Sequence, residues 1–197
     1  DVCSSDLSVC TVDGDCMMAL KVFHCMKRMG IQPTAGAYTA LMGGLQKKGR
    51  WEDAVKVFNR MEVDGVKPDL RAYNTLIAAC ARGGAWEKAW AVFQSIERNG
   101  EQPDTTSYNS VISACTRCRE YDRAVEIFKM VLKASKVPYS TVRLNHYTYN
   151  TMIDVCAQKG KVKQAFALLR TMQKQKMRVD AITMSSVVAA CANGREF

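Results

Sequence analysis

The stretch KPDLRAYNTLIAAC, residues 67–80, decides the fold of this chain, because three later segments nearly repeat it. They read EQPDTTSYNSVISAC (101–115), LNHYTYNTMIDVC (144–156) and VDAITMSSVVAAC (179–191). Each copy places apolar residues and a cysteine at helical spacing after a short polar lead. An apolar core accounts for the recurring isoleucine or valine and for the cysteine. It does not account for the asparagine that follows the tyrosine in three copies, so that residue needs a separate explanation.

A fixed period of 35 residues divides the chain into repeats. Full units of this length cover 35–69, 70–104 and 146–180. The unit at 105–145 carries six extra residues near the segment PYSTVR. Such a period is the signature of a repeat architecture, in which each unit is one supersecondary structure.

The segments at the two ends do not form whole units. Residues 8–34 are a partial first repeat, and residues 181–197 read as the first helix of a truncated one. The opening DVCSSDL resembles a translated sequencing adapter, so we interpret residues 1–7 as a non-native leader. We therefore expect this chain to be a fragment of a longer array.

Each unit predicts two helices joined by a short turn. In the unit 70–104, Tyr73, Ile77 and Cys80 share one stripe of the first helix, and Ala89 and Phe93 share one stripe of the second. Gly83-Gly84 breaks the first helix, and Pro103 enforces an extended connection to the next unit. Because neither helix can bury its stripe alone, the units must stack. The sequence predicts an all-α solenoid of stacked antiparallel helix-turn-helix repeats.

The chain has nine cysteines, and those that recur from unit to unit are placed like core residues. Four of them occupy the same place in successive units, as a small buried hydrophobe would: Cys80, Cys115, Cys156 and Cys191. Cys115 and Cys118 are the one close pair, and no second pair lies at zinc-ligand spacing. The pattern predicts free thiols, no metal site and no cofactor.

The charge of the chain points to a polyanionic partner. Lysine and arginine number 28 against 19 acidic residues, a net charge of +9. Nucleic acid is the first candidate and an anionic membrane the second, while a solvated basic surface is the plain alternative. No run of about 18 apolar residues exists, so no membrane span is expected.

The sequence carries no pattern of catalytic residues. It has no clustered carboxylates for a two-metal site and no His-x-Glu with a cysteine pair for a zinc deaminase. The two histidines, His24 and His146, lie far apart, and we expect His146 in a linker between units. We therefore expect no enzyme within these residues.

The repeats resemble the pentatricopeptide repeat family across residues 15–197. The resemblance rests on the 35-residue length, the Tyr-Asn-Thr-x-Ile opening, the alanine and phenylalanine of the second helix, and the closing Lys-Pro-Asp. The related tetratricopeptide repeat has 34 residues and an early Trp-Leu-Gly pattern that is missing here. The resemblance implies a right-handed superhelix that binds single-stranded RNA, one base per repeat.

The resemblance also implies which side chains read the bases. They are the residue after the first-helix tyrosine and the last residue of each unit. Carried over, Thr39 with Asp69 implies guanine, whereas Asn74 with Asp104, and Asn150 with Asp180, imply uracil. Asn109 with Asn145 implies a pyrimidine, cytosine favoured, and Ser185 is a reader whose partner lies beyond residue 197. The implied core is therefore GU[C/U]U.

The residues themselves leave two interpretations of these positions open. An asparagine near a helix start can cap the helix, and Pro-Asp can form a turn, without any base contact. Alternatively, the amide can pair with a base edge, because it offers both donors and an acceptor. Recurrence alone does not decide between them, since caps recur as well.

Cations and aromatic residues extend the expected interface. Lys47, Arg82 and Arg117 share one place near the end of the first helix and suit a phosphate backbone, or equally a helix dipole. In the family an aliphatic residue two before the tyrosine wedges between bases. Here Tyr147 could stack on a base instead, and Ile182 alone keeps the family pattern; the other units carry Gly36, Arg71 and Thr106.

We therefore expect a monomeric, sequence-selective RNA-binding protein. The resemblance implies a chloroplast or mitochondrial location and a role in RNA processing, stability, editing or translation. The rival is a helical-repeat scaffold for protein partners, because such arrays also bind peptides. Polar residues at the reading places favour RNA, while a peptide groove would carry apolar or aromatic residues there.

Overall fold

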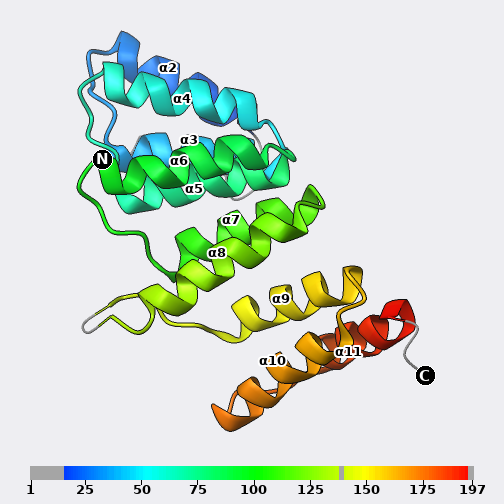
Figure 1. Cartoon of the computed structure of the whole chain (residues 1–197). Helices are drawn as coiled ribbons and strands as arrows, with labels where there is room; N and C mark the ends of the chain where they lie inside the picture. The colour runs from blue at the N-terminus through cyan, green and yellow to red at the C-terminus, as the bar shows by residue number, and fades with distance from the viewer. Residues whose placement is uncertain (1–15, 138–139, 195–197) are drawn as a thin grey trace. The chain divides into compact units, whose positions relative to one another are not determined.

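The computed structural model describes residues 16–137 and 140–194, and in these residues every element of regular structure is an α-helix. The predicted leader at 1–7 lies outside the described residues. The chain is divided into two compact units. The first ends at Pro103 and the second begins at Asp104. Each unit is an array of antiparallel helix pairs, as the sequence predicts (Figure 1).

The first unit contains α2 to α6, whose bounds are Cys16–Arg28, Ala35–Lys47, Trp51–Val63, Leu70–Arg82 and Trp86–Arg98. The first helices of its repeats, α3 and α5, pack against each other, while α4 and α6 pack beside them as second helices. Helix α2 packs on α3 and is the second helix of the partial first repeat. The first helices thus form one layer and the second helices another.

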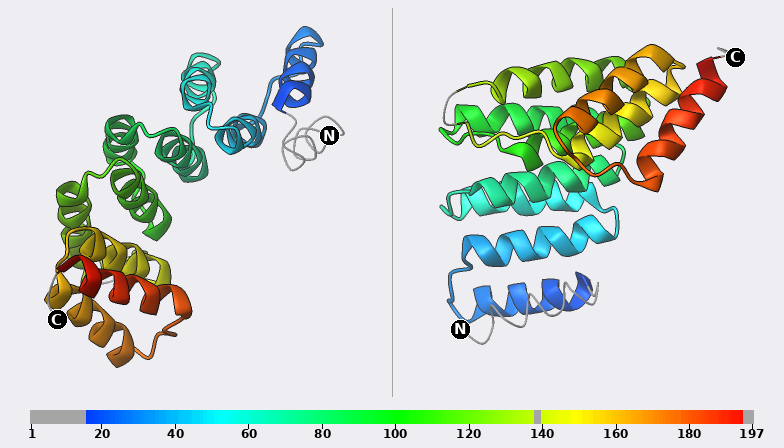
Figure 2. Two further views of the ribbon diagram at one scale, coloured as in Figure 1. Left: turned by 90° about the vertical axis from the view of Figure 1, so that its right-hand side faces the viewer. Right: turned by 90° about the horizontal axis from the view of Figure 1, so that it is seen from below.

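The second unit contains α7 to α11, whose bounds are Thr105–Arg117, Tyr121–Ala134, His146–Gln158, Val162–Lys174 and Ala181–Gly194 (Figure 2). Helix α9 packs against both α7 and α11, and α8 and α10 lie beside them. The extra residues of the unit 105–145 fall between α8 and α9. The expectation that His146 lies in a linker is wrong, because His146 is the first residue of α9.

The recurring tyrosine joins neighbouring repeats through its ring. Tyr73 is 1% exposed and packs against Phe58 of the preceding second helix, with ring centroids 5.2 Å apart. The same contact joins Tyr38 to Phe23 at 4.9 Å and Tyr149 to Phe128 at 6.2 Å. Burial of such a ring stabilises the stack far more than the pair geometry alone.

The hydroxyl of the same tyrosine joins the two helices of its own repeat. Tyr73 Oη accepts a hydrogen bond of 2.6 Å from Asn99 Nδ2, just after α6. Tyr149 Oη donates to Gln175 Oε1 at 3.2 Å, just after α10. Tyr38 donates to Asp64 after α4, and burial together with this bond raises the pKa of Tyr38. The tyrosine therefore recurs because one side chain joins three helices.

A fully buried alanine lets the helices approach closely. Ala54, Ala89, Ala124 and Ala165 are all 0% exposed, at one place of each second helix. The apolar residues four positions later fill the adjacent space and are also buried: Phe58, Phe93, Phe128 and Leu169. Spacing of four puts each pair on one face of its helix, so the second-helix stripe predicted from sequence is the buried one.

The turn after most first helices needs a left-handed backbone. Gly49, Gly84 and Gly160 have φ of 70°, 75° and 62° there. In the unit 105–145 this conformation falls on Arg119, with φ of 63°. Glycine adopts it without the steric penalty that a side chain brings, so this turn is the least favourable of the four.

Three of the recurring cysteines are buried, as predicted. Cys80, Cys115 and Cys156 lie in the core, and burial raises the thiol pKa of Cys80 to about 11 and that of Cys115 to about 12. Cys191, in α11, is only half-buried. Cys25 is exposed.

We expect these thiols to differ sharply in reactivity. At pH 8, iodoacetamide should alkylate Cys25 at least about a hundredfold faster than Cys80 or Cys115, because the buried thiols are neutral and shielded. Peptide mass mapping after timed quenching assigns each site. Addition of urea should equalise the rates. Equal rates in the folded protein would contradict the buried placement.

Candidate nucleic-acid interface

One stripe of the first helices carries the predicted wedge and reader and, in α3, α5 and α7, the predicted cation. Counted from the start of the helix, these are the second, fifth and thirteenth residues, and helical spacing puts them on one face. In α5 they are Arg71, Asn74 and Arg82, and in α9 they are Tyr147, Asn150 and Gln158. We call this face the reader stripe. It lies beside the buried stripe that contains the tyrosine.

The last residue of a repeat caps the first helix of the next repeat. Asp69 accepts from Ala72 N at 2.7 Å, and Asp104 accepts from Ser107 N at 2.8 Å. Asn145 caps α9 in the same way, with Thr148 N at 3.0 Å. The end-of-repeat residue is therefore a helix cap, whatever else it does. The asparagine after the tyrosine is not a cap, because it lies inside its helix.

The cap brings two distant reading residues together in the unit 105–145. Asn109 Nδ2 lies 3.4 Å from Asn145 Oδ1, although the two are 36 positions apart. The hydroxyl of Thr148 lies 2.7 Å from Asn109 Oδ1 and 2.9 Å from Asn145 Oδ1. Asn109 is 8% exposed, so only an edge of its amide reaches solvent. The two amides form one polar site at the start of α9.

The unit 146–180 repeats this arrangement with a carboxylate. Thr183 donates from its backbone N to Asp180 Oδ1 at 2.8 Å, and its hydroxyl lies 2.7 Å from both Asp180 Oδ1 and Asn150 Oδ1. His146 Nε2 lies 3.1 Å from Asp180 Oδ2 and 3.3 Å from Asn150 Nδ2. The bonds from Thr183, and then His146 and Asn150, hold the pKa of Asp180 below its usual range.

The predicted reader of the first full unit is held differently. Thr39 is 6% exposed, and its hydroxyl donates to Ala35 O within α3 at 2.9 Å. The residue of the next repeat that corresponds to Thr148 is Ala72, which has no hydroxyl. Thr39 is thus oriented by its own helix rather than by the following repeat.

The other predicted residues take the positions that their sequence places imply. Asn74 is half-buried in α5, Asp104 caps α7, and Ser185 is exposed on α11. Tyr147 is 52% exposed and Ile182 67% exposed. Both wedge residues therefore present their side chains to solvent beside a reader, which is where a base could stack.

The cations lie at the ends of the first helices. Lys47, Arg82 and Arg117 are exposed last residues of α3, α5 and α7. In α9 this place is Gln158, and the adjacent Lys159 forms an ion pair with Asp122 of α8. That pairing lowers the pKa of Asp122. Lys159 therefore joins two repeats rather than adding to the reader stripe.

Sequence reasoning missed two kinds of residue in these sites. The third residue of a first helix, Thr148 or Thr183, contacts both members of a reading pair. Its signal was the recurrence of serine or threonine three residues after the end-of-repeat residue, which is typical of a capping box. His146 was missed because it was expected in a linker.

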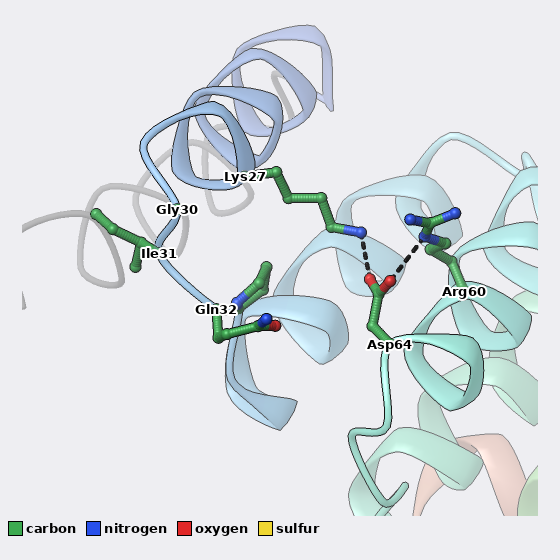
Figure 3. A pocket seen from close by; sticks show the side chains of 7 residues that line it. Lys27, Gly30, Ile31, Gln32, Arg60 and Asp64 are labelled. Atoms are coloured by element: carbon green, nitrogen blue, oxygen red, sulfur yellow. Dashed lines mark hydrogen bonds and ion pairs between the residues drawn. The ribbon is translucent and has the colours of Figure 1, made fainter.

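A hollow between the end of α2, the loop that follows it and the end of α4 is a packing feature. It is lined by Lys27, Ile31, Arg60 and Asp64, among others. Figure 3 shows Lys27 and Arg60 converging on the Asp64 carboxylate, and Arg60 Nε lies 2.9 Å from Oδ1. Both cations pair with one carboxylate, whose pKa is lowered first by Lys27 and then by Tyr38. These ion pairs join the end of α2 to the end of α4.

The described part of the chain has neither a membrane-spanning helix nor a cluster of metal ligands. No helix among residues 16–137 and 140–194 is long and apolar enough to cross a membrane. Within the same residues, no group of three or more histidine, cysteine or acidic side chains could hold a metal ion.

Comparison with known families gives two matches that together span most of the chain. A family described as "Pentatricopeptide repeat-containing protein" matches residues 1–131. A family described as "PPR repeat family" matches residues 144–193. A search of curated proteins finds no match.

Solved structures share the fold. The pentatricopeptide repeat protein PPR10 from maize is 26% identical with a TM-score of 0.74, covering 95% of this chain, which spans only 26% of PPR10. PPR10 in complex with an 18-nt psaJ RNA element is 23% identical with a TM-score of 0.67, covering 98% of this chain and 34% of that one. The PPR domain of Arabidopsis thaliana protein-only RNase P 1, in complex with tRNA, is 18% identical with a TM-score of 0.79, covering 95% and 96%.

Proposed function

Because the chain belongs to the family of pentatricopeptide repeat-containing proteins, we propose that it binds single-stranded RNA and selects bases through its reader stripe. The observation that carries the proposal is the pairing of polar residues across repeats in the second unit. Asn109 Nδ2 lies within hydrogen-bonding distance of Asn145 Oδ1. The amide of Asn150 contacts Asp180 and His146, so the polar groups of both sites are held at fixed positions. Such groups can pair with the Watson–Crick edge of an unstacked base.

The neighbours support the choice of RNA over peptide. PPR10 is seen with an RNA element and the protein-only RNase P domain with tRNA. A peptide groove would present apolar residues, whereas the reader places here are Thr, Asn, Asn, Asn and Ser. The net charge of +9 adds long-range attraction to a polyanion.

The proposed base preferences follow the order of the repeats. Thr39 with Asp69 selects guanine, Asn74 with Asp104 selects uracil, and Asn109 with Asn145 selects a pyrimidine, cytosine favoured. Asn150 with Asp180 selects uracil, which gives the core GU[C/U]U. The exposed cations Lys47, Arg82 and Arg117 contact phosphates, and Tyr147 stacks on a base.

The proposed role in the cell is RNA metabolism in a chloroplast or mitochondrion. A protein of this kind would protect, process, edit or help translate a transcript by covering one segment of it. No chemical step is assigned to residues of this chain. The chain acts as a monomer in this role, since one strand of RNA engages one array.

The test is binding of the chain to fluorescein-labelled RNA containing GUCU, to a shuffled RNA and to the DNA equivalent. We expect a preference for GUCU RNA, and we expect its affinity to fall by roughly an order of magnitude between 50 and 200 mM salt for a few phosphate contacts. Fluorescence polarisation measures both. Equal affinity for all three ligands would refute base reading and leave only a basic surface. Absence of binding, with helicity intact by circular dichroism, would favour a peptide partner.

A further inference from the structure

We infer that His146 is a third, specificity-determining member of the reading site formed by Asn150 and Asp180. The inference rests on the proposed function and goes beyond the two-residue reading of each repeat. His146 Nε2 lies 3.1 Å from Asp180 Oδ2 and 3.3 Å from Asn150 Nδ2, so one ring nitrogen contacts both reading residues.

The position of His146 explains why it reaches this site. The first residue of a first helix lies beside the connection that leads into the next repeat. Thr105, at the same place in α7, exchanges hydrogen bonds with the backbone of Arg143, at 3.1 Å and 2.8 Å, two residues before Asn145. The corresponding residues of the other first helices are Ala35, Leu70 and Ala181. Only the unit 146–180 therefore places an imidazole here.

The hydrogen-bond pattern indicates what the imidazole does. Asp180 Oδ1 already accepts from the backbone N and faces the hydroxyl of Thr183. Oδ2 is the remaining acceptor, and a protonated Nε2 is the donor that a carboxylate requires. If Nε2 carried no proton, its lone pair would face the carboxylate at 3.1 Å, which is unfavourable. The geometry therefore selects the form of His146 with a proton on Nε2.

Occupation of Oδ2 has a consequence for the reader amide. With Oδ2 satisfied by His146, Asp180 depends less on the hydroxyl of Thr183, whose single proton can then go to Asn150 Oδ1 at 2.7 Å. His146 and Asn150 then both donate to Asp180, and Thr183 donates to Asn150, so this cluster of four side chains holds the amide in one orientation. An amide held in one orientation discriminates between donor and acceptor edges, as those of uracil and cytosine at N3.

The imidazole is also accessible to RNA. The side chain of His146 is 40% exposed and that of Asp180 is 28% exposed, so a base that approaches Asn150 meets the ring as well. By contrast, the site of Asn109 and Asn145 has Thr105 in this place, and Thr105 bonds the backbone instead. The two sites of the second unit should therefore differ in how strictly they select a pyrimidine.

The experiment measures base selectivity at one RNA position. The full chain is tested as wild type, His146→Phe and His146→Gln against short RNAs that carry GUCU, GUCC, GUCA or GUCG between adenosine flanks. His146→Phe keeps a ring without nitrogen, and His146→Gln keeps an amide donor of similar reach. We expect the preference for uracil over cytosine at the fourth base to fall about three- to tenfold in His146→Phe, and to recover in His146→Gln. Selectivity at the second base should not change.

Two controls make the result decisive. His24→Phe changes the other histidine, which is exposed on α2, a second helix outside the reader stripe, and should leave all preferences unchanged. Asn150→Thr tests the proposed function itself. If Asn150→Thr alters the fourth-base preference while His146→Phe does not, the role of His146 is refuted and base reading stands. If neither variant alters it, both are refuted.

A spectroscopic signature tests the assigned proton. In ¹⁵N-histidine-labelled protein, Nε2 of His146 should show the chemical shift of a protonated nitrogen, and Asp180→Asn should alter that shift. A signal of an unprotonated Nε2 in the wild type would overturn the assignment.

Discussion

Tyr73→Ala is expected to lower the free energy of unfolding of the first unit by about 3–5 kcal/mol, the range seen when a buried aromatic residue is truncated. The ring is 1% exposed and contacts Phe58 of the preceding repeat, while its hydroxyl accepts a bond from Asn99. The substitution therefore leaves a cavity between α4 and α5 and unpairs a side chain after α6. Urea titration followed by circular dichroism measures the loss.

Two matched variants separate the parts of this effect. Tyr73→Phe keeps the ring and removes only the hydroxyl, so it should cost about 1 kcal/mol. Tyr147→Ala removes a tyrosine that is 52% exposed, and it should change stability by less than about 0.5 kcal/mol. If Tyr73→Ala cost no more than Tyr73→Phe, the ring would not be the contact that holds the repeats together.

Asn150→Thr should change the preferred fourth base from uracil to guanine. The variant would reproduce the pair formed by Thr39 and Asp69, to which the proposed function assigns guanine. Guanine offers two N–H donors on its Watson–Crick edge, which suit the carboxylate of Asp180. A mispaired base edge costs about 1–3 kcal/mol. We therefore expect the wild type to prefer GUCU over GUCG by about tenfold, and Asn150→Thr to prefer GUCG over GUCU by about tenfold. Competition binding with GUCU and GUCG measures the exchange.

The control for this switch is the same chemical change elsewhere. Asn59 is exposed on α4, a second helix outside the reader stripe, and Asn59→Thr should leave the ratio of GUCU to GUCG binding unchanged. Thermal unfolding of both variants excludes a loss of structure as the cause. A weaker overall affinity in Asn150→Thr, with no change in that ratio, would contradict base selection by Asn150.

The sequence by itself determined the fold. The 35-residue period is visible because each unit must bury the same apolar faces of its two helices. Ala89, Phe93 and Ile77 recur in equivalent form wherever two helices meet. A repeat contacts mainly its neighbours, so local sequence carries nearly all the information that the stack needs. The recurring tyrosine followed from the same rule, although its hydroxyl bond to the second helix did not.

The tertiary structure alone decided how the polar sites are built. Asn109 and Asn145 are 36 positions apart, and only the packing of α7 against α9 brings their amides within 3.4 Å. The same packing places Thr148 between them. His146, which was expected in a linker, is the first residue of α9 and lies beside Asp180. Hydrogen bonds depend on distances and angles between side chains of different repeats. A periodic pattern records which residues recur, but it does not record those distances.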